Sequence, residues 1–209
     1  MVEWSPRPTG AQDHEDEIVL DYLSRNGGPR HRVLVDVGAY SKELSNSLSL
    51  LQSGWRGILL EADTDKSERL KKDFEGMDVE IIMQAVGDKD CIADFYVNIH
   101  PGGHSFMWGF NANQDKERVR KIRMRPLADI LDEHDVPFDF DFLQVDTEGF
   151  DQKIILTLLD DKRYRPRVIC MEFGMEDPIP MLAERGYELL KQTITTGRYS
   201  NVIFVDNGI

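Results

Sequence analysis

Residues 33–63 read VLVDVGAYSKELSNSLSLLQSGWRGILLEAD, and this run predicts the architecture of the chain. Residues 33–37 form a short and mostly apolar run, which is typical of a strand covered on both faces. Gly38 then turns the chain, leucines recur at helical spacing over residues 42–52, and residues 57–61 form a second apolar run. A strand, a tight turn, a helix and a second strand are the layout of the nucleoside-binding half of a doubly wound α/β domain.

The polar residues of this run discriminate between nucleoside ligands. Glu61 closes the second strand 23 positions after Gly38, an interval that suits hydrogen bonds to ribose hydroxyls. A G-x-G-x-x-G phosphate cradle would need glycines where Tyr40 and Glu43 stand. Asp36 would repel a pyrophosphate, but it would attract an ammonium or a sulfonium. S-adenosylmethionine has both cations, a ribose and no phosphate, so we expect it as the ligand; a plain βαβ unit with incidental acids is the alternative.

Composition restricts the class of protein. The chain has 209 residues and a net charge of −13, which argues against a sequence-independent grip on nucleic acid. The two cysteines, Cys91 and Cys170, are far apart and are expected to be reduced thiols, Cys170 in a buried strand. No apolar leader is found at the N-terminus, and no apolar run reaches the roughly 20 residues of a membrane span. We therefore expect a cytoplasmic protein with no membrane span.

The rest of the chain alternates between segments with helical periodicity and segments with strand periodicity. A doubly wound, mostly parallel α/β sheet of about seven strands with one reversed strand is therefore predicted. Residues 93–97 are expected to pair antiparallel with a neighbour. Helices are expected at 15–23, 42–52, 65–74, 126–134, 151–159 and 180–185, and strands at 33–37, 57–61, 80–86, 93–97, 119–124, 140–145, 168–173, 187–192 and 201–205.

Six segments of the chain carry family motifs in the same order: DVGAYSKELSN, GWRGILLEAD, AVGDKD, RPLADIL, FLQVDTEGFDQKII and VICMEF. Together they resemble the FkbM family of S-adenosylmethionine-dependent methyltransferases. The strongest piece is LQVDTEG at 143–149, which is similar to the family's K-I-D-x-E-G motif with Gln144 in place of the lysine. The resemblance implies a Rossmann-like class I methyltransferase fold. It also implies methyl transfer to a hydroxyl of a sugar or glycan. The prolines and polar residues at the start of the chain, and the helical pattern that follows them, predict an N-terminal arm and lead-in helix at 1–30, which leaves a single methyltransferase domain at 31–209.

Site residues are expected at the carboxyl ends of the strands, where ligands of open α/β sheets bind. Asp146 and Glu148 are expected to face the acceptor as catalytic residues, and helix capping is their alternative role. His104, in a glycine-rich aromatic segment, is a candidate general base, although a lone loop histidine is often merely exposed. Cofactor contacts are assigned to Asp36, Gly38, Ala39, Tyr40, Ser41, Glu61, Ala62, Gln84 and Ala85.

A metal ion is the main mechanistic alternative. Asp146 and Glu172, with Glu148, are candidate ligands for Mg²⁺, which prefers oxygen donors. Such an ion would bind two adjacent hydroxyls of the acceptor and lower the pKa of the one that is methylated.

Charge is unevenly distributed along the chain. Basic residues cluster in 116–125, whereas 127–151 contains nine acids and no Lys or Arg. Solvated faces, or a strand that bridges to acidic neighbours, explain this pattern, and binding of an acidic acceptor is the functional alternative.

Two other functions stay open. One is an NAD-dependent oxidoreductase or epimerase, which the missing phosphate glycines disfavour. The other is a non-catalytic, degenerate methyltransferase-fold binding module, because Tyr40 and Lys42 replace the asparagine and second glycine of the family's G-A-N-x-G turn. The expected partner is a small-molecule or glycan acceptor, not nucleic acid, and the oligomeric state is open.

Overall fold

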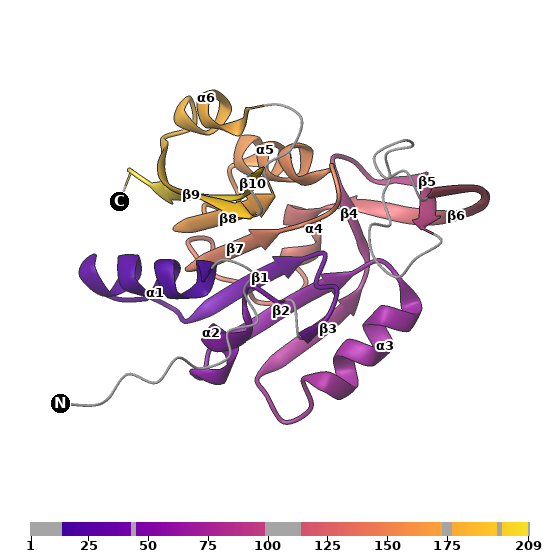
Figure 1. The fold of residues 1–209 in the computed structure, drawn as a ribbon, viewed down its shortest axis with the longest axis horizontal. Coiled ribbons are helices and arrows are strands. Elements are labelled where there is room, and N and C mark those ends of the chain that lie inside the picture. Colours follow the sequence, from indigo (N-terminus) through magenta and orange to yellow (C-terminus); the bar gives the residue numbers. More distant parts are fainter. Residues whose placement is uncertain (1–13, 43–44, 99–113, 173–176, 196–197, 209) are drawn as a thin grey trace.

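A seven-stranded sheet forms the centre of the molecule (Figure 1). The computed structural model describes residues 14–42, 45–98, 114–172, 177–195 and 198–208. The strand order is β3-β2-β1-β7-β8-β10-β9, and only β10 runs antiparallel to its neighbours. The predicted mostly parallel sheet with one reversed strand is therefore confirmed. Its strands are β1 (Val33–Val37), β2 (Arg56–Glu61), β3 (Val79–Met83), β7 (Phe142–Val145), β8 (Val168–Glu172), β9 (Tyr187–Thr195) and β10 (Arg198–Asp206).

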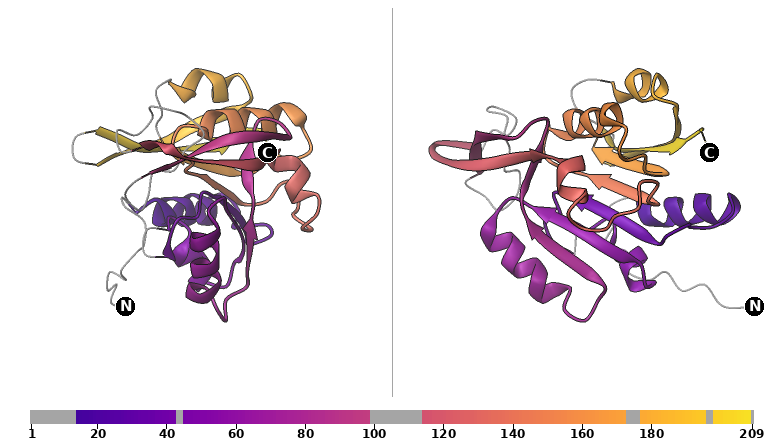
Figure 2. Two further views of the ribbon diagram at one scale, coloured as in Figure 1. Left: turned by 90° about the vertical axis from the view of Figure 1, so that its right-hand side faces the viewer. Right: turned by 180° about the vertical axis from the view of Figure 1, so that it is seen from behind.

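Helices cover both faces of this sheet (Figure 2). One face packs against α1 (Glu15–Arg25), α2 (Leu48–Gln52) and α3 (Thr64–Asp73), and the other against α4 (Leu127–Leu131), α5 (Asp151–Asp161) and α6 (Pro178–Ala183). This double cover explains why the central strands are apolar on both sides. The strand order reverses between β1 and β7, and ligands of doubly wound folds bind at the carboxyl ends of the strands at such a point.

A second, three-stranded sheet was not predicted. It has the order β4-β6-β5 and contains β4 (Ala85–Gly87), β5 (Cys91–Asn98) and β6 (Gln114–Pro126). The prediction of one strand over 80–86 is wrong, because the chain changes sheets at Gln84. There the backbone N–H bonds to Glu61 O (3.1 Å), and the side-chain amide donates to the carbonyls of Ala85 and Arg123. The expected antiparallel pairing of 93–97 is confirmed as β5 with β6.

In the part of β6 whose side chains the structure describes, residues 119–126, the basic residues pair with acids. Lys121 bonds to Asp94, Arg123 to Asp90 and Arg125 to Glu133, and most of these side chains are exposed. The pattern therefore matches a strand that bridges to acidic neighbours. Exposed pairs of this kind contribute little stability each, so their main effect is to neutralise the basic stretch.

The helix predicted over 42–52 is shorter than expected, since α2 begins at Leu48. Ser47 Oγ donates to Asp36 Oδ2 (2.7 Å), and Ser47 N donates to Ser45 Oγ (3.1 Å). Side-chain hydrogen bonds of this kind compete with helical ones. The polar residues before α2 therefore contact the end of β1 instead of extending the helix.

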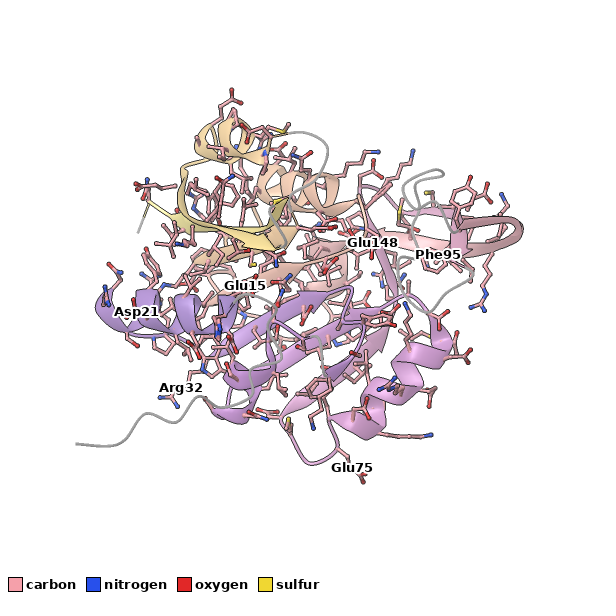
Figure 3. The ribbon with its side chains drawn as sticks, viewed as in Figure 1. Glu15, Asp21, Arg32, Glu75, Phe95 and Glu148 are labelled. Carbon is pink, nitrogen blue, oxygen red and sulfur yellow. The ribbon has the colours of Figure 1, made fainter. Side chains whose placement is uncertain are left out.

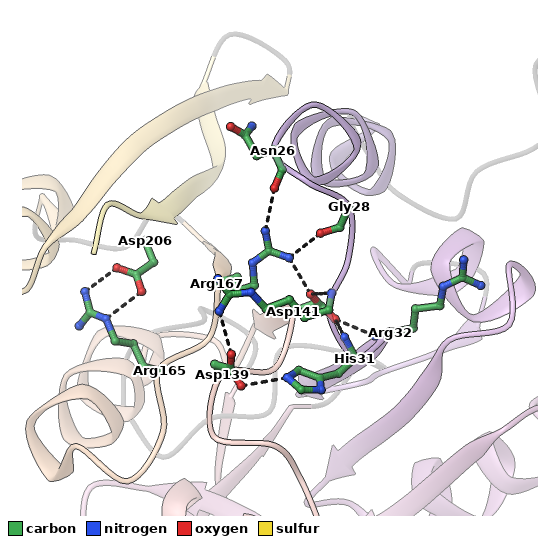
Figure 4. A network of polar contacts seen from close by, with 10 residues as sticks. Asn26, Gly28, His31, Arg32, Asp139, Asp141, Arg165, Arg167 and Asp206 are labelled. Atoms are coloured by element: carbon green, nitrogen blue, oxygen red, sulfur yellow. Dashed lines mark hydrogen bonds and ion pairs between the residues drawn. The ribbon is translucent and has the colours of Figure 1, made fainter. Parts of the chain in front are cut away.

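A buried ion pair closes the opposite, amino end of the sheet (Figure 4). Asp141 is fully buried, and its carboxylate accepts a hydrogen bond from Arg167 Nη1 (3.0 Å). The same carboxylate accepts the backbone N–H groups of Arg30, His31 and Arg32 at 2.7–2.8 Å, an anion-binding nest made by the segment before β1. These contacts join the amino ends of β7 and β8 to that segment, at the opposite end of the strands from the carboxyl ends.

The structure also bears on the predictions about the cysteines and about a membrane span. Cys170 is buried in β8, Cys91 is half-buried in β5, and both are free thiols. Within the residues that the structure describes, no helix combines the length and the apolar character that a membrane crossing requires.

Candidate functional site

The glycine turn after β1 touches the loop after β7. Gly38 N donates to Leu60 O, and Asp146 N donates to Val37 O, both at 2.9 Å. Gly38 has φ +89°, and a Cβ at this position would overlap the backbone carbonyl of Asp146. Only glycine allows both this dihedral angle and this approach without strain. The turn therefore sets the spacing between β1 and Asp146 at the point where the strand order reverses.

Two buried carboxylates flank this turn. Asp36 is the second-to-last residue of β1 and is 3% exposed, and burial raises its pKa to about 6 although Ser47 and Ser45 donate hydrogen bonds to it. Glu61 ends β2, and its Oε1 accepts from Asp63 N at 2.8 Å. Burial also raises the pKa of Glu61, and the nearby ammonium of Lys66 opposes that rise. A carboxylate has about four acceptor positions, so each group keeps capacity for a ligand.

Three more carboxylates converge beyond β7 and β8. Asp146, Asp151 and Glu172 each offer an oxygen within 4.8 Å of the others. Burial, followed by the charge of Asp151, raises the pKa of Glu172 to about 7. Burial raises the pKa of Asp151 to about 6, and burial with the neighbouring acids raises that of Asp146 well above its usual range. We call Asp36, Glu61, Asp146, Glu148, Asp151 and Glu172 the acidic rim.

The loop between Asp146 and α5 brings Asp151 back to the rim. Glu148 and Gly149 both have left-handed dihedral angles, φ 55° and 102°. Asp151 Oδ2 then accepts hydrogen bonds from Thr147 Oγ1 (3.0 Å) and Gly149 N (3.2 Å). Figure 3 shows Glu148 at the end of the sheet to which the strands β1 and β2 point.

A lysine lies beside these acids. Lys66, in the first turn of α3, has its Nζ 4.3 Å from the centroid of the Tyr40 ring. Burial lowers the pKa of Lys66, whereas Glu61, Asp63, Glu148 and Asp146 act in the opposite direction. The rim therefore contains a cation supplied by the chain itself.

Asp63 links the rim to the second sheet. Its Oδ1 caps α3 by accepting from the backbone N–H groups of Asp65 and Lys66. Its Oδ2 pairs with Arg120 Nη1 of β6 at 3.0 Å. The hairpin of β5 and β6 is thus held next to Glu61.

The structure places the residues predicted from sequence as follows. Asp36, Gly38, Glu61, Asp146, Glu148 and Glu172 all lie at the carboxyl ends of the strands. Ala39 and Ser41 are buried in the turn after β1, and Tyr40 and Ala62 are half-buried. Gln84 and Ala85 lie where the chain passes between sheets, and the side-chain N–H₂ of Gln84 is already engaged. His104 lies outside the described residues.

Two residues of the site were missed by sequence reasoning. Asp151 looks from the sequence like an acid that only begins a helix, although its spacing from Asp146 in D-T-E-G-F-D was a usable signal. Lys66 carried no signal, because nothing local relates it to Tyr40.

Comparisons with known proteins show which family the chain resembles. A family model described as the methyltransferase FkbM domain matches residues 36–189, a range that contains the whole acidic rim. No curated protein matches the chain.

Three solved structures that are similar to this chain carry methyltransferase or methylase names. An FkbM methyltransferase from Methylobacillus flagellatus KT is 14% identical, with a TM-score of 0.51, and the match covers 82% of this chain and 42% of that one. The putative methylase HI0767 from Haemophilus influenzae is 17% identical, with a TM-score of 0.53 and coverage of 94% and 90%. The METTL16 methyltransferase domain is 12% identical, with a TM-score of 0.56 and coverage of 93% and 66%.

At these identities the structural likeness shows the fold alone, a Rossmann-like class I methyltransferase fold. The chain spans less than half the length of the FkbM structure that it matches. The family model, in contrast, matches more than half of this chain. The chain therefore belongs to the FkbM methyltransferase domain family.

Proposed function

We propose that this chain transfers a methyl group from S-adenosylmethionine to a hydroxyl, in the first instance that of a sugar or glycan. The observation that supports the proposal most is the pair Asp36 and Glu61, two buried carboxylates on either side of the Gly38 turn. Cations and ribose hydroxyls suit such a pair, whereas a pyrophosphate does not. The sugar or glycan acceptor follows from the family resemblance.

The residues fit S-adenosylmethionine in three respects. Glu61 can accept hydrogen bonds from ribose hydroxyls, as acids at the end of the second strand do in nucleoside-binding folds. Asp36 offers a negative charge to the ammonium group. The missing Cβ of Gly38 lets the turn approach the backbone of Asp146, which brings the proposed acceptor side next to these two acids. When bound, the cofactor supplies a methyl group on a positively charged sulfur.

On the acceptor side, Asp146 and Glu148 are the proposed catalytic residues. Their role would be to hold the acceptor hydroxyl and to remove its proton as the oxygen attacks the methyl group. Carboxylates whose pKa is raised are better bases near neutral pH, and burial raises the pKa of both groups. His104 stays a second candidate for the general base.

Mg²⁺ is proposed as a second component, held by Asp146 and Glu172 with Asp151. The donor set fits, since three carboxylates offer oxygens within 4.8 Å of one another and Mg²⁺ prefers oxygen ligands. Bound there, the ion would lower the pKa of an acceptor hydroxyl.

The proposal is tested by calorimetry with S-adenosylhomocysteine, the product of the donor. We expect binding, and we expect Glu61→Gln to weaken it by about tenfold or more, because a hydrogen bond to a charged group contributes about 1.5–3 kcal/mol. Glu75→Gln is the matched control, since Glu75 is exposed in the loop after α3.

The same experiment separates the alternatives. Binding of NAD without binding of S-adenosylhomocysteine would support an oxidoreductase or epimerase. If calorimetry detects no heat of binding with either NAD or S-adenosylhomocysteine, and neither ligand shifts the melting temperature, the proposal is refuted and the non-catalytic binding module is favoured. Equal binding by the wild type and Glu61→Gln would refute the assignment of Glu61 to the ribose.

A further inference from the structure

Lys66 joins the turn after β1 to the end of β2. Its backbone N–H donates to Asp63 Oδ1 (3.2 Å), which places it in the first turn of α3. Its half-buried side chain extends to Tyr40, with Nζ 4.3 Å from the ring centroid. Tyr40 directly follows Gly38 and Ala39, the two residues that turn the chain at the end of β1.

Carboxylates from two sides act on this ammonium. Glu61 and Asp63 lie at the end of β2, and Glu148 and Asp146 lie in the loop after β7. The effect is mutual, since Lys66 is the charge that opposes the raised pKa of both Glu61 and Glu148. Lys66 therefore neutralises part of the acidic rim from a position between the proposed cofactor side and the proposed acceptor side.

We propose that Lys66 determines how strongly the site distinguishes the cationic donor S-adenosylmethionine from its neutral product S-adenosylhomocysteine. The inference rests on the proposed function. A sulfonium and an ammonium compete for the same carboxylates and for the same aromatic face, because a tyrosine ring attracts either cation. Lys66 repels the sulfonium of the donor but not the neutral sulfur of the product.

Lys66 therefore limits how much more tightly the acidic rim binds the cationic donor than the neutral product. An acidic rim alone would favour the donor strongly over the product. With Lys66 in place the two bind more equally, so the product competes with the donor and the activity follows the ratio of the two.

The test is a calorimetric comparison of Lys66→Gln with the wild type. Three ligands are used: S-adenosylmethionine, S-adenosylhomocysteine and sinefungin, which has an amine in place of the methylsulfonium. We expect Lys66→Gln to bind the two cationic ligands about twentyfold more tightly, which is the order of magnitude for unit charges about 8–10 Å apart at an effective dielectric constant near 20. Binding of S-adenosylhomocysteine should change by no more than about twofold.

Two further variants complete the design. Lys66→Arg retains the charge, so its donor-to-product affinity ratio should stay at the wild-type value. Lys153→Gln is the matched control, because Lys153 also lies over an aromatic ring, that of Phe150 at 4.5 Å, but on the exposed side of α5.

The outcomes are distinguishable. Equal changes for all three ligands would overturn the inference while the proposed function stands. Weaker binding of all three by Lys66→Gln would also overturn it and would make Lys66 a direct ligand of the nucleoside. If the wild type binds none of the three, the proposed function fails, and the inference fails with it.

Discussion

Replacement of Gly38 by alanine should destabilise the protein more than any ordinary glycine substitution. Two separate effects act at this position. The backbone has φ +89°, a left-handed conformation that costs an alanine about 1–2 kcal/mol. The added Cβ would also come closer than 3.0 Å to the carbonyl carbon and oxygen of Asp146, and both are backbone atoms that cannot rotate away.

The second effect can be given a magnitude. Overpacking of a close contact costs typically about 1–3 kcal/mol, so Gly38→Ala should lose about 2–5 kcal/mol in total. A domain of this kind has only about 5–15 kcal/mol of stability, which makes the loss easy to measure. Because the clash pushes on Asp146, binding of S-adenosylhomocysteine should weaken as well.

Gly76→Ala separates the two effects. Gly76 has φ +84°, nearly the same dihedral angle, but nothing lies within 4 Å of the position that an added Cβ would take. Urea unfolding of both variants should therefore give a smaller loss for Gly76→Ala, by about 1–3 kcal/mol. Equal losses, or a Gly38→Ala protein with unchanged ligand binding, would refute the close approach of the turn to Asp146.

Three further predictions concern charges. Since the pKa of Asp36 is raised from 3.8 to about 6, the native state holds an extra proton between these values, so wild-type stability falls as pH rises through that window. Asp36→Asn should match the wild type near pH 4 and exceed it by up to about 3 kcal/mol at pH 8; urea unfolding that shows the same difference at both pH values would contradict this. Arg167→Met should lose about 3–5 kcal/mol, because it leaves the buried charge of Asp141 without its ion-pair partner, yet it should leave nucleoside affinity unchanged in the folded fraction; a selective loss of affinity would be evidence against a purely structural role. Mg²⁺ should raise the melting temperature of the wild type by a few degrees and that of Glu172→Gln by less, and identical shifts would exclude Glu172 as a ligand.

Much of the fold could be predicted because its signals are local. The apolar runs of β1 and β7, the leucines of α2 and the acids after the strands each lie within a few consecutive residues. The mostly parallel sheet with one reversed strand followed from the alternation of elements and from the strand pair at the end of the chain. The predictions failed where side chains act over a distance, as at Ser47, whose bond to Asp36 shortens α2, and at Gln84, whose bonds divide one predicted strand between two sheets.

The sequence by itself determined that Gly38 turns the chain and that Asp36, Glu61, Asp146 and Glu172 lie at the ends of strands, because periodicity and residue type identify strand ends. Only the tertiary structure decided which charges meet. Asp151 reaches Asp146 through the left-handed dihedral angles of Glu148 and Gly149, and Lys66 reaches Tyr40 although 26 positions separate them. Such convergence depends on strand register and loop geometry. Helical and strand periodicity are local to one element, so neither predicts the distance between side chains of different elements.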